Sequence, residues 1–432
     1  MKTPISSKLN LRYFGEALRS RKGDVWLVSA KWAAPVLSLV GGILAARSLS
    51  PEALGAFQVV ALIPVYTTFL QLGVFNGLNR NLPLCLARDQ GQQAQDFVNA
   101  SARVAKYCAV IGAVGALGAT IFFLFNQAEP LYAYIALFLV PGLVFRPLRI
   151  HQDTIYRGTR EFERLGKSQY LQNFWVFLCS ASTSLLGITA LGVKLATQNL
   201  VGWLFLLRGV PFRNQGNAKW SDARRLSAVG LPMLVTGLIF SWLSAADRTI
   251  VAALLSAEDL GFFALSGLAL NSLRVFPQSI NVLLYPRVAH AYGVHGSSRH
   301  LRRYIWIGLG LNLAVLIPTA IIGWFLLPHL VHLVLPAYVP GIPAAKVTLL
   351  GAVFFAYSGP SVVVPIVRRN TPAHIGGVIA IGLVWIGGMI AISAGYGIVG
   401  VACARLLANA FYGVFMIAYV FHLTAIDIPC KL

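Results

Sequence analysis

GLPMLVTGLIFSWLSAADRTIVAALL, residues 230–255, is the stretch of sequence that decides the fold. This apolar run is longer than the ~20 residues that a helix needs to cross the hydrocarbon core of a bilayer. Asp247 and Arg248 interrupt the run about two-thirds of the way along it. A charge at the centre of a membrane helix costs about 2.5–3.5 kcal/mol, so such residues usually face a cavity or a partner. Because adjacent helical residues do not face each other, we expect at least one of the two to reach another helix or water.

A short motif at the end of this stretch occurs twice in the chain. Residues 49–57 read LSPEALGAF, and residues 255–263 read LSAEDLGFF. Leu, Ser, Glu, Leu, Gly and Phe recur at identical spacing, 206 residues apart, and each copy joins two apolar runs. A repeat near half the chain length predicts two similar helical bundles, and transporters built in this way bind their substrate between the halves.

The composition is that of a polytopic membrane protein. Apolar residues make up 57% of the chain and charged residues only 11%, against about 25% charged in soluble domains. The net charge of +21 does not indicate a nucleic-acid partner, because no basic cluster is joined to a soluble fold. An excess of Lys and Arg on cytoplasmic loops explains the charge better. The five cysteines lack metal-ligand spacing, so we expect no metal, no cofactor and no disulfide framework.

Apolar runs predict an all-α fold of twelve membrane spans in two six-helix lobes. The predicted organisation is a cytoplasmic segment at 1–24, an N-lobe at 25–210, a linker at 211–229, a C-lobe at 230–422 and a tail at 423–432. The predicted spans are roughly 25–46, 54–78, 104–125, 131–145, 171–187, 191–207, 230–255, 261–285, 304–327, 343–367, 375–394 and 398–422.

The distribution of basic residues supports this count. With the N-terminus inside, most of the 35 Lys and Arg residues fall on inner segments, and the outer loops hold only Arg47 and Lys194. The alternation places both termini in the cytoplasm. The largest inner segment, 146–170, is expected to continue the fourth helix as an amphipathic arm. Every outer loop is short, and no phosphate-cradling glycine-rich loop is present, so neither an outer catalytic domain nor ATP hydrolysis is expected.

Polar residues form stripes on three of the predicted spans. A polar stripe in a membrane helix must face protein or water, and hydrogen bonding between helices is the alternative to lining a cavity. The two stripes on the second and eighth spans coincide when the chain is shifted by the repeat. Their members are Thr68, Gln71, Phe75 and Asn79 on the second span, Asn271, Arg274, Gln278 and Asn281 on the eighth, and Arg405, Asn409 and Tyr412 on the twelfth.

The charges expected deep in the spans are mostly positive. They are the cations Lys31, Arg248, Arg274 and Arg405 and a single carboxylate, Asp247. Arg274 and Arg405 sit too deep to reach the surface easily and either line a cavity or form an ion pair with Asp247, whereas Lys31 either lines the cavity or snorkels to the cytoplasmic interface. A cationic cavity attracts phosphate, which arginine binds with a fork of donors. Asp247 is the candidate residue for coupling to protons or sodium ions.

The chain resembles a known family, the Wzx-type polysaccharide or O-antigen flippases of the multidrug/oligosaccharidyl-lipid/polysaccharide (MOP) exporter superfamily. The resemblance lies in residues 43–60, 230–266 and 395–415. It implies two six-helix lobes in a V shape and the flipping of an undecaprenyl-diphosphate-linked oligosaccharide across the bacterial inner membrane. It also implies Arg248 and Arg274 as lining cations, membrane lipids around the protein and a polysaccharide polymerase as partner. Related lipid II flippases have fourteen spans, two more than predicted here.

Three other functions remain open from the sequence. A multidrug or cation antiporter of the MATE branch would share the fold, but organic cations favour buried acids. A membrane enzyme, such as a glycan polymerase or ligase, would need catalytic groups on a long outer loop. Buried charges argue against a scaffold subunit without transport, because such charges cost insertion energy and have no evident structural use.

Overall fold

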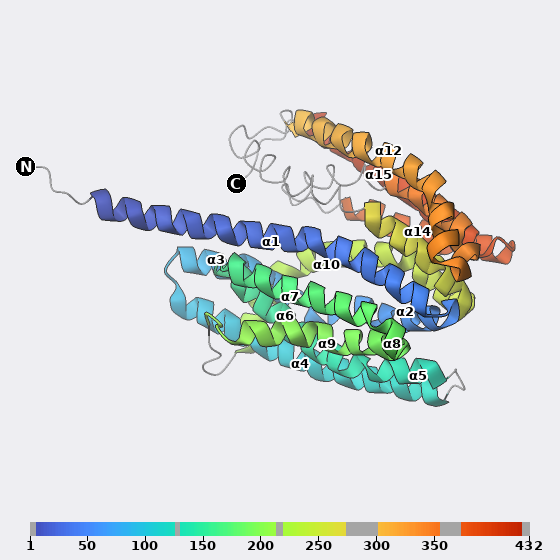
Figure 1. Cartoon of the computed structure of the whole chain (residues 1–432). Coiled ribbons are helices and arrows are strands. Elements are labelled where there is room, and N and C mark those ends of the chain that lie inside the picture. Colours follow the sequence, from blue (N-terminus) through green and yellow to red (C-terminus); the bar gives the residue numbers. More distant parts are fainter. Residues whose placement is uncertain (1–5, 126–129, 213–218, 274–300, 355–372, 426–432) are drawn as a thin grey trace, which may run out of the picture. The chain divides into compact units, whose positions relative to one another are not determined.

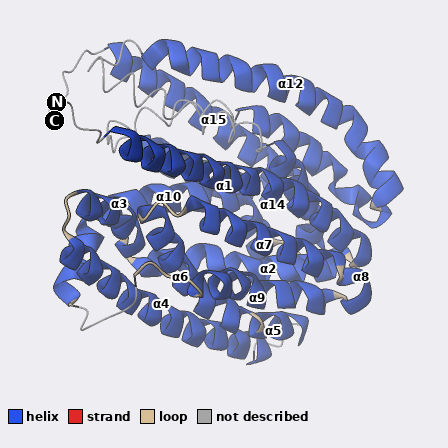
Figure 2. Cartoon of the chain, turned by 60° about the vertical axis from the view of Figure 1, so that its left-hand side comes forward, coloured by secondary structure: helices blue, strands red, loops and turns tan. Residues whose placement is uncertain are grey.

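The computed structural model describes every residue except 1–5, 126–129, 213–218, 274–300, 355–372 and 426–432. These described residues form helices joined by short turns, with no strand among them (Figures 1 and 2). The predicted all-α membrane fold is therefore confirmed. Within the described ranges, 10 helices are long and apolar enough to cross a membrane, and each coincides with a predicted span. The predicted span at 171–187 lies largely in a more polar helix that is not among the 10 candidate spans. The predicted span at 261–285 is only partly described. The count of twelve spans therefore stays a prediction.

Residue contacts divide the chain into two compact units. Unit 1 is Met1–Gly41 with Tyr66–Val235, and unit 2 is Gly42–Val65 with Thr236–Leu432. The predicted lobe boundaries, at 210 and 230, stay predictions.

Unit 1 is organised around α6 (Leu139–Gly158), which packs against α3, α4 and α9. Buried apolar residues from α3, α4 and α6, joined by Leu226 of α10, form its main core. Much of α6 is therefore enclosed by other helices of unit 1, and several of its polar side chains, such as His151 and Gln152, are buried. The other elements are η1 (Thr67–Gln71), α3 (Val74–Ala87), α4 (Gly91–Phe125), α5 (Pro130–Leu137), α7 (Phe162–Ala181), α8 (Thr183–Leu186), α9 (Ile188–Leu207), and parts of α1 (Ser6–Ser48) and α10 (Trp220–Leu254).

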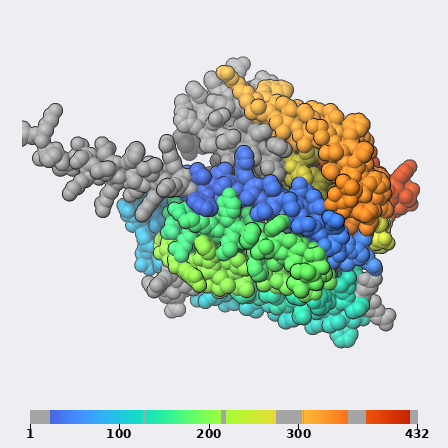
Figure 3. Space-filling model, in the orientation of Figure 1, coloured from blue at the N-terminus to red at the C-terminus, as the bar shows by residue number. Residues whose placement is uncertain are grey.

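The long helix α1 lies along α7 within unit 1. The Asn173 amide donates a hydrogen bond to the Ala30 carbonyl at 3.0 Å, and the rings of Trp26 and Tyr170 meet edge to face, 5.6 Å apart. In the space-filling view, the blue atoms of α1 lie directly against the green atoms of α7 (Figure 3). The first membrane span is thus fixed to its unit by both polar and aromatic contacts.

Unit 2 places the second half of α10 against α14 and α15, which pack along each other (Figure 1). Leu243 and Ala246 of α10, Val384 of α14 and Ala408 and Met416 of α15 share one apolar core. The elements of this unit are most of α2 (Pro51–Tyr66), a helix at 257–273, α12 (Leu301–Val334), η2 (Pro336–Gly341), a helix at 342–354, α14 (Ala373–Ser393) and α15 (Gly397–Ala425).

Both copies of the repeated motif start a helix in the same way. The Ser50 hydroxyl accepts a hydrogen bond from the amide of Ala53 at 3.2 Å. In the second copy, the Ser256 hydroxyl accepts one from the amide of Asp259 at 3.1 Å. A serine at the N-cap satisfies an amide that the first helical turn leaves unpaired. The serine recurs at the same position in both copies because it caps the helix that follows.

The glycine of each copy contacts the other copy. A side chain on Gly55 would overlap with the Ala257 carbonyl, and one on Gly261 would overlap with the Pro51 carbonyl. Ala257 and Pro51 are themselves equivalent positions of the repeat. The two copies thus meet in a reciprocal contact that brings backbone against backbone and that only glycine permits.

Candidate functional site

The second membrane span is broken in its middle, which corrects the continuous span predicted at 54–78. The helix α2 gives way to the short 3₁₀ helix η1, and Leu72 and Gly73 then take left-handed backbone conformations with φ of 46° and 78°. A leucine in that region is strained, and strain of this kind clusters at functional sites. Irregular backbone at membrane depth is tolerated where it is buried in protein or lines a cavity.

Neighbouring helices satisfy the backbone groups that the break exposes. The Ser227 hydroxyl, on α10, donates to the Leu72 carbonyl at 2.6 Å. The Cys108 thiol, on α4, donates to the Leu70 carbonyl at 3.4 Å. The break is therefore a fixed feature of unit 1, held from two sides.

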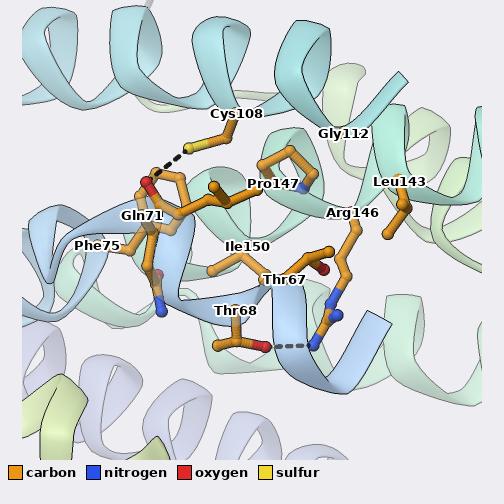
Figure 4. Close-up of a pocket in the computed structure, with 11 residues that line it drawn as sticks. Thr67, Thr68, Gln71, Phe75, Cys108, Gly112, Leu143, Arg146, Pro147 and Ile150 are labelled. Carbon is orange, nitrogen blue, oxygen red and sulfur yellow. Dashed lines mark hydrogen bonds between the residues drawn. The ribbon is translucent and has the colours of Figure 1, made fainter. Parts of the chain in front are cut away.

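A pocket lies at this break, between η1, α3, α4 and α6 (Figure 4). It leaves about 40 Å³ for the centres of water molecules, and one water needs roughly 10–15 Å³ of such space. The pocket therefore holds a group of a few heavy atoms rather than a sugar ring. Its lining residues are Thr67, Thr68, Leu70, Gln71, Phe75, Cys108, Gly112, Leu143, Arg146, Pro147 and Ile150.

Arg146 gives this pocket its charge. Its guanidinium reaches from α6 and donates to the Thr68 hydroxyl at 3.0 Å (Figure 4). The residues that line the pocket include no Asp or Glu. The pocket is thus lined by a cation and by hydroxyl groups, with no acid among its lining residues.

Gln71, which the sequence predicted to line a cavity, also lines this pocket. The residue is only 9% exposed, and its side-chain oxygen has no hydrogen-bond partner. A buried polar atom without a partner costs about 1–3 kcal/mol. The site therefore contains a polar group that a ligand would satisfy.

The C-terminal half of α6 carries further charged residues. The sequence predicted that the segment 146–170 continues the fourth helix, and α6 does extend to Gly158, with Arg149 only 4% exposed. Arg149 forms an ion pair with Asp153, with 3.6 Å between Nε and Oδ2. Asp153 is therefore a carboxylate, besides the predicted Asp247, that is largely enclosed by protein and paired with an arginine. Arg146, Arg149 and Asp153 fall at i, i+3 and i+7, a helical-face pattern that could have revealed them.

Lys194 corrects one assignment made from the sequence. It was assigned to an outer loop, but it lies inside α9. Its ammonium donates to the Ser180 hydroxyl of α7 at 3.5 Å. Lys194 is thus a half-buried helical residue of unit 1.

In unit 2, Asp247 and Arg405 form a buried ion pair across α10 and α15. Their closest atoms are 3.6 Å apart, and the side chains are 7% and 2% exposed. The Arg405 guanidinium also donates to the Leu243 carbonyl and, at 3.1 Å, to the Asn409 side-chain oxygen. Asn409 donates in turn to the Gly351 carbonyl at 3.3 Å. Arg405 thus adopts the ion-pair alternative weighed from the sequence, and its role in binding substrate stays a prediction.

The remaining predicted site residues are less buried. Arg248 is half-buried, its backbone amide donates to the Asp247 carboxylate at 2.9 Å, and its guanidinium donates to the Ser244 carbonyl at 3.3 Å. Lys31 on α1, Asn79 on α3 and Asn271 on the helix at 257–273 are exposed. Arg274 and Gln278 lie outside the described residues.

Comparison with known proteins agrees with the fold. The model of the family described as polysaccharide biosynthesis protein matches residues 43–336. No curated protein shows a significant sequence match. The lipid II flippase MurJ, in an inward closed conformation, superimposes with a TM-score of 0.74 at 14% identity, covering 92% of this chain and 87% of that chain.

Two further solved structures belong to transporters of the MOP superfamily. A multidrug resistance MATE family transporter in an inward-facing conformation has a TM-score of 0.67 at 13% identity, covering 92% of this chain and 98% of that one. A transporter from Pyrococcus furiosus, described as having a binding pocket of reverse polarity, has a TM-score of 0.66 at 12% identity, covering 94% of this chain and 96% of that one. These likenesses show that the chain has the MOP fold.

Proposed function

This chain belongs to the polysaccharide biosynthesis protein family, and we propose that it is a secondary transporter for a lipid-linked glycan. Its substrate is an undecaprenyl-diphosphate-linked oligosaccharide, a repeat unit of O-antigen, capsule or exopolysaccharide. The protein flips this molecule across the bacterial inner membrane by alternating access and performs no catalysis. Both termini face the cytoplasm, and a polysaccharide polymerase receives the product on the far side.

The observation that carries the proposal is the cationic pocket at the break in the second span. The Arg146 guanidinium lies beside a cavity whose lining residues include no acid. Broken helices in transporters line substrate and ion sites, and a buried cation next to a cavity attracts an anionic group. The diphosphate is the anionic part of the proposed substrate. Lys31, Arg248 and Arg274 are proposed as further cations along its path.

Asp247 is proposed as the residue that couples transport to a proton or sodium gradient. Its carboxylate lies 3.6 Å from Arg405, so a change in its charge alters the balance of a buried pair. Full glycan export by an Asp247→Asn variant would remove Asp247 from the coupling mechanism.

A multidrug or cation antiporter is the alternative function. It is favoured by the buried carboxylates Asp153 and Asp247, one in each unit, because organic cations bind to acids. Both carboxylates, however, lie next to arginines, so neither offers an uncompensated negative charge to a cationic drug.

The test is the accumulation of lipid-linked glycan in a strain that lacks the gene. Wild-type protein should clear the intermediates that collect on the inner leaflet, whereas a variant with Arg146→Gln should not. Intact glycan export without the gene, together with increased sensitivity to cationic drugs, would favour the antiporter.

A further inference from the structure

We propose that a surface of unit 1, where α4 and α10 meet, binds the head group of an anionic phospholipid of the surrounding membrane. This basic-aromatic surface consists of Arg103, Lys106 and Tyr107 on α4 and of Trp220 and Arg224 on α10. None of these residues lines the pocket described above, and the inference does not depend on what the protein transports. The lipid belongs to the leaflet that is cytoplasmic in the orientation proposed above.

The two basic residues of α4 stand where this helix enters the membrane. From Val104 to Phe125 the helix carries no charged residue apart from Lys106. At 1.5 Å per residue this stretch is about 33 Å long, which matches the ~30 Å hydrocarbon core of a bilayer. Arg103 and Lys106 therefore lie at the level of the lipid head groups.

The face of α4 that carries Lys106 and Tyr107 continues along the span as an exposed apolar face. Val110, Val114 and Ile121 are all exposed, and they follow Tyr107 at helical intervals. A molecule with a charged head and apolar chains contacts the basic residues and the apolar face together. A soluble anion gains nothing from that face, so the arrangement favours a lipid.

The start of α10 repeats this arrangement beside α4. Arg224 lies one turn after Trp220, both are exposed, and the exposed Leu231 lies farther along the same face. Leu226 of α10 and Val104 of α4 belong to one buried core. The two helices are thus fixed next to each other, and each presents basic residues followed by an apolar face.

Trp220 holds the arginine of this surface. The Arg103 Cζ lies 5.9 Å from the centre of the Trp220 ring, and the centre of the Tyr107 ring lies 5.4 Å from that of the same indole. A guanidinium that stacks on an aromatic ring keeps the N–H donors at its edge, and these bind phosphate in a bidentate manner. Trp and Tyr are themselves typical of the membrane–water interface. The three side chains therefore form a preorganised site for a phosphate group.

The basic residues of this surface form no ion pair with any acid in the described part of the chain. Asp222 on α10 is buried and pairs with Arg225, with 3.6 Å between Oδ1 and Nη1. A second cation–aromatic pair of unit 1 differs in this respect. Lys167 lies over Trp26, 5.5 Å from the ring centre, but its ammonium is 2.6 Å from the Glu163 carboxylate. That pair is neutralised, whereas the basic-aromatic surface retains its attraction for an anion.

The test measures binding of phosphatidylglycerol to the full-length protein by native mass spectrometry, with zwitterionic phosphatidylcholine as the reference lipid. We expect the wild type to bind phosphatidylglycerol at least about tenfold more tightly than phosphatidylcholine. Arg103→Gln and Lys106→Gln should each weaken phosphatidylglycerol binding about fivefold, the factor that one basic residue contributes near an anionic surface. Trp220→Leu keeps every charge but removes the ring under Arg103, and it should weaken binding about threefold.

The matched control is Lys167→Gln, which removes a cation from the neutralised cation–aromatic pair and should leave binding unchanged. Equal binding of the two lipids by the wild type would overturn the proposal, because the charge of the head group would then play no part. Unchanged binding in the double variant Arg103→Gln/Lys106→Gln would overturn it too, as would an equal loss in Lys167→Gln. Displacement of the lipid by inorganic phosphate at similar concentration would show a site for any anion and would also contradict the assignment.

Discussion

The two units hold arginines in different surroundings. Arg405 in unit 2 lies against a carboxylate, an amide and a carbonyl, and its side chain is 2% exposed. Arg146 in unit 1 is half-buried, donates to the Thr68 hydroxyl and lies at a pocket whose lining residues include no Asp or Glu. The first arginine lies against a fixed carboxylate, whereas the second lies beside a space that an anion can enter. The comparison teaches that the surroundings of an arginine in a helical bundle decide whether it can serve a ligand.

The largest effect should come from breaking the pair in unit 2. Asp247→Asn leaves the Arg405 charge buried without a counter-ion, which costs about 3–5 kcal/mol. Thermal unfolding of the purified protein in detergent should show a large loss of stability. The double variant Asp247→Asn/Arg405→Met should recover most of it, because a neutral pair has no charge to compensate. A single variant as stable as wild type would show that the two arginines do not differ as described.

The next effect concerns the motif that both halves share. Gly55→Val and Gly261→Val each force a side chain into the backbone of the other copy, and overpacking of this kind costs about 1–3 kcal/mol. Because the contact is reciprocal, the two substitutions should destabilise the protein to a similar extent in chemical or thermal unfolding. Gly118→Val on α4 is the control, since a side chain there meets nothing within 4 Å. A large loss from only one of the two motif substitutions would contradict the reciprocal contact.

Arg146→Gln should change transport more than stability. It removes the cation from a pocket whose lining residues include no Asp or Glu, so we expect about a tenfold loss of glycan export and a change in unfolding free energy of less than about 1 kcal/mol. Export and thermal unfolding are measured on the same preparation. A loss of stability as large as that of Asp247→Asn, with export per folded molecule unchanged, would make Arg146 a structural residue like Arg405.

The smallest effects are expected at the two helix caps. Ser50→Ala and Ser256→Ala each remove an N-cap, worth about 0.5–2 kcal/mol. Ser256→Ala should cost more, because the Ser256 hydroxyl also donates to the Asp259 carboxylate at 2.6 Å. Unfolding curves of the two variants provide the measurement, and equal losses would show that the bond from the hydroxyl to this carboxylate adds nothing to the cap.

The fold was predictable because apolar runs of this length have few alternatives in a membrane. Residues 230–255 and the repeated motif indicated a helical bundle with an internal repeat, and the two capping serines explain why the motif recurs. The break at 67–73 was not predicted, because the apolar composition of a span does not show where its backbone departs from helix. Gly73, with its positive φ, was the one local signal.

The candidate site was predictable only in part. Gln71 was found because polar residues in an apolar span stand out. Arg146 and Asp153 were missed, because counting basic residues by loop assigns every charge near a span end to the cytoplasm. Their burial depends on α4 and α9, which cover α6 on two sides. The spacing of Arg146, Arg149 and Asp153 indicates that they share a helical face, but it does not show that other helices cover that face.

The contact between Gly55 and Gly261 has the form of a homodimer interface enclosed in one chain. Equivalent residues touch in exchanged roles, which is the property of an isologous interface between identical subunits. A half-length chain with one copy of the motif would present a surface complementary to itself. In such a dimer every substitution acts twice, once on each side of the axis. After fusion of the two halves, a substitution acts once, and one half can keep a buried Asp–Arg pair while the other opens a cationic pocket.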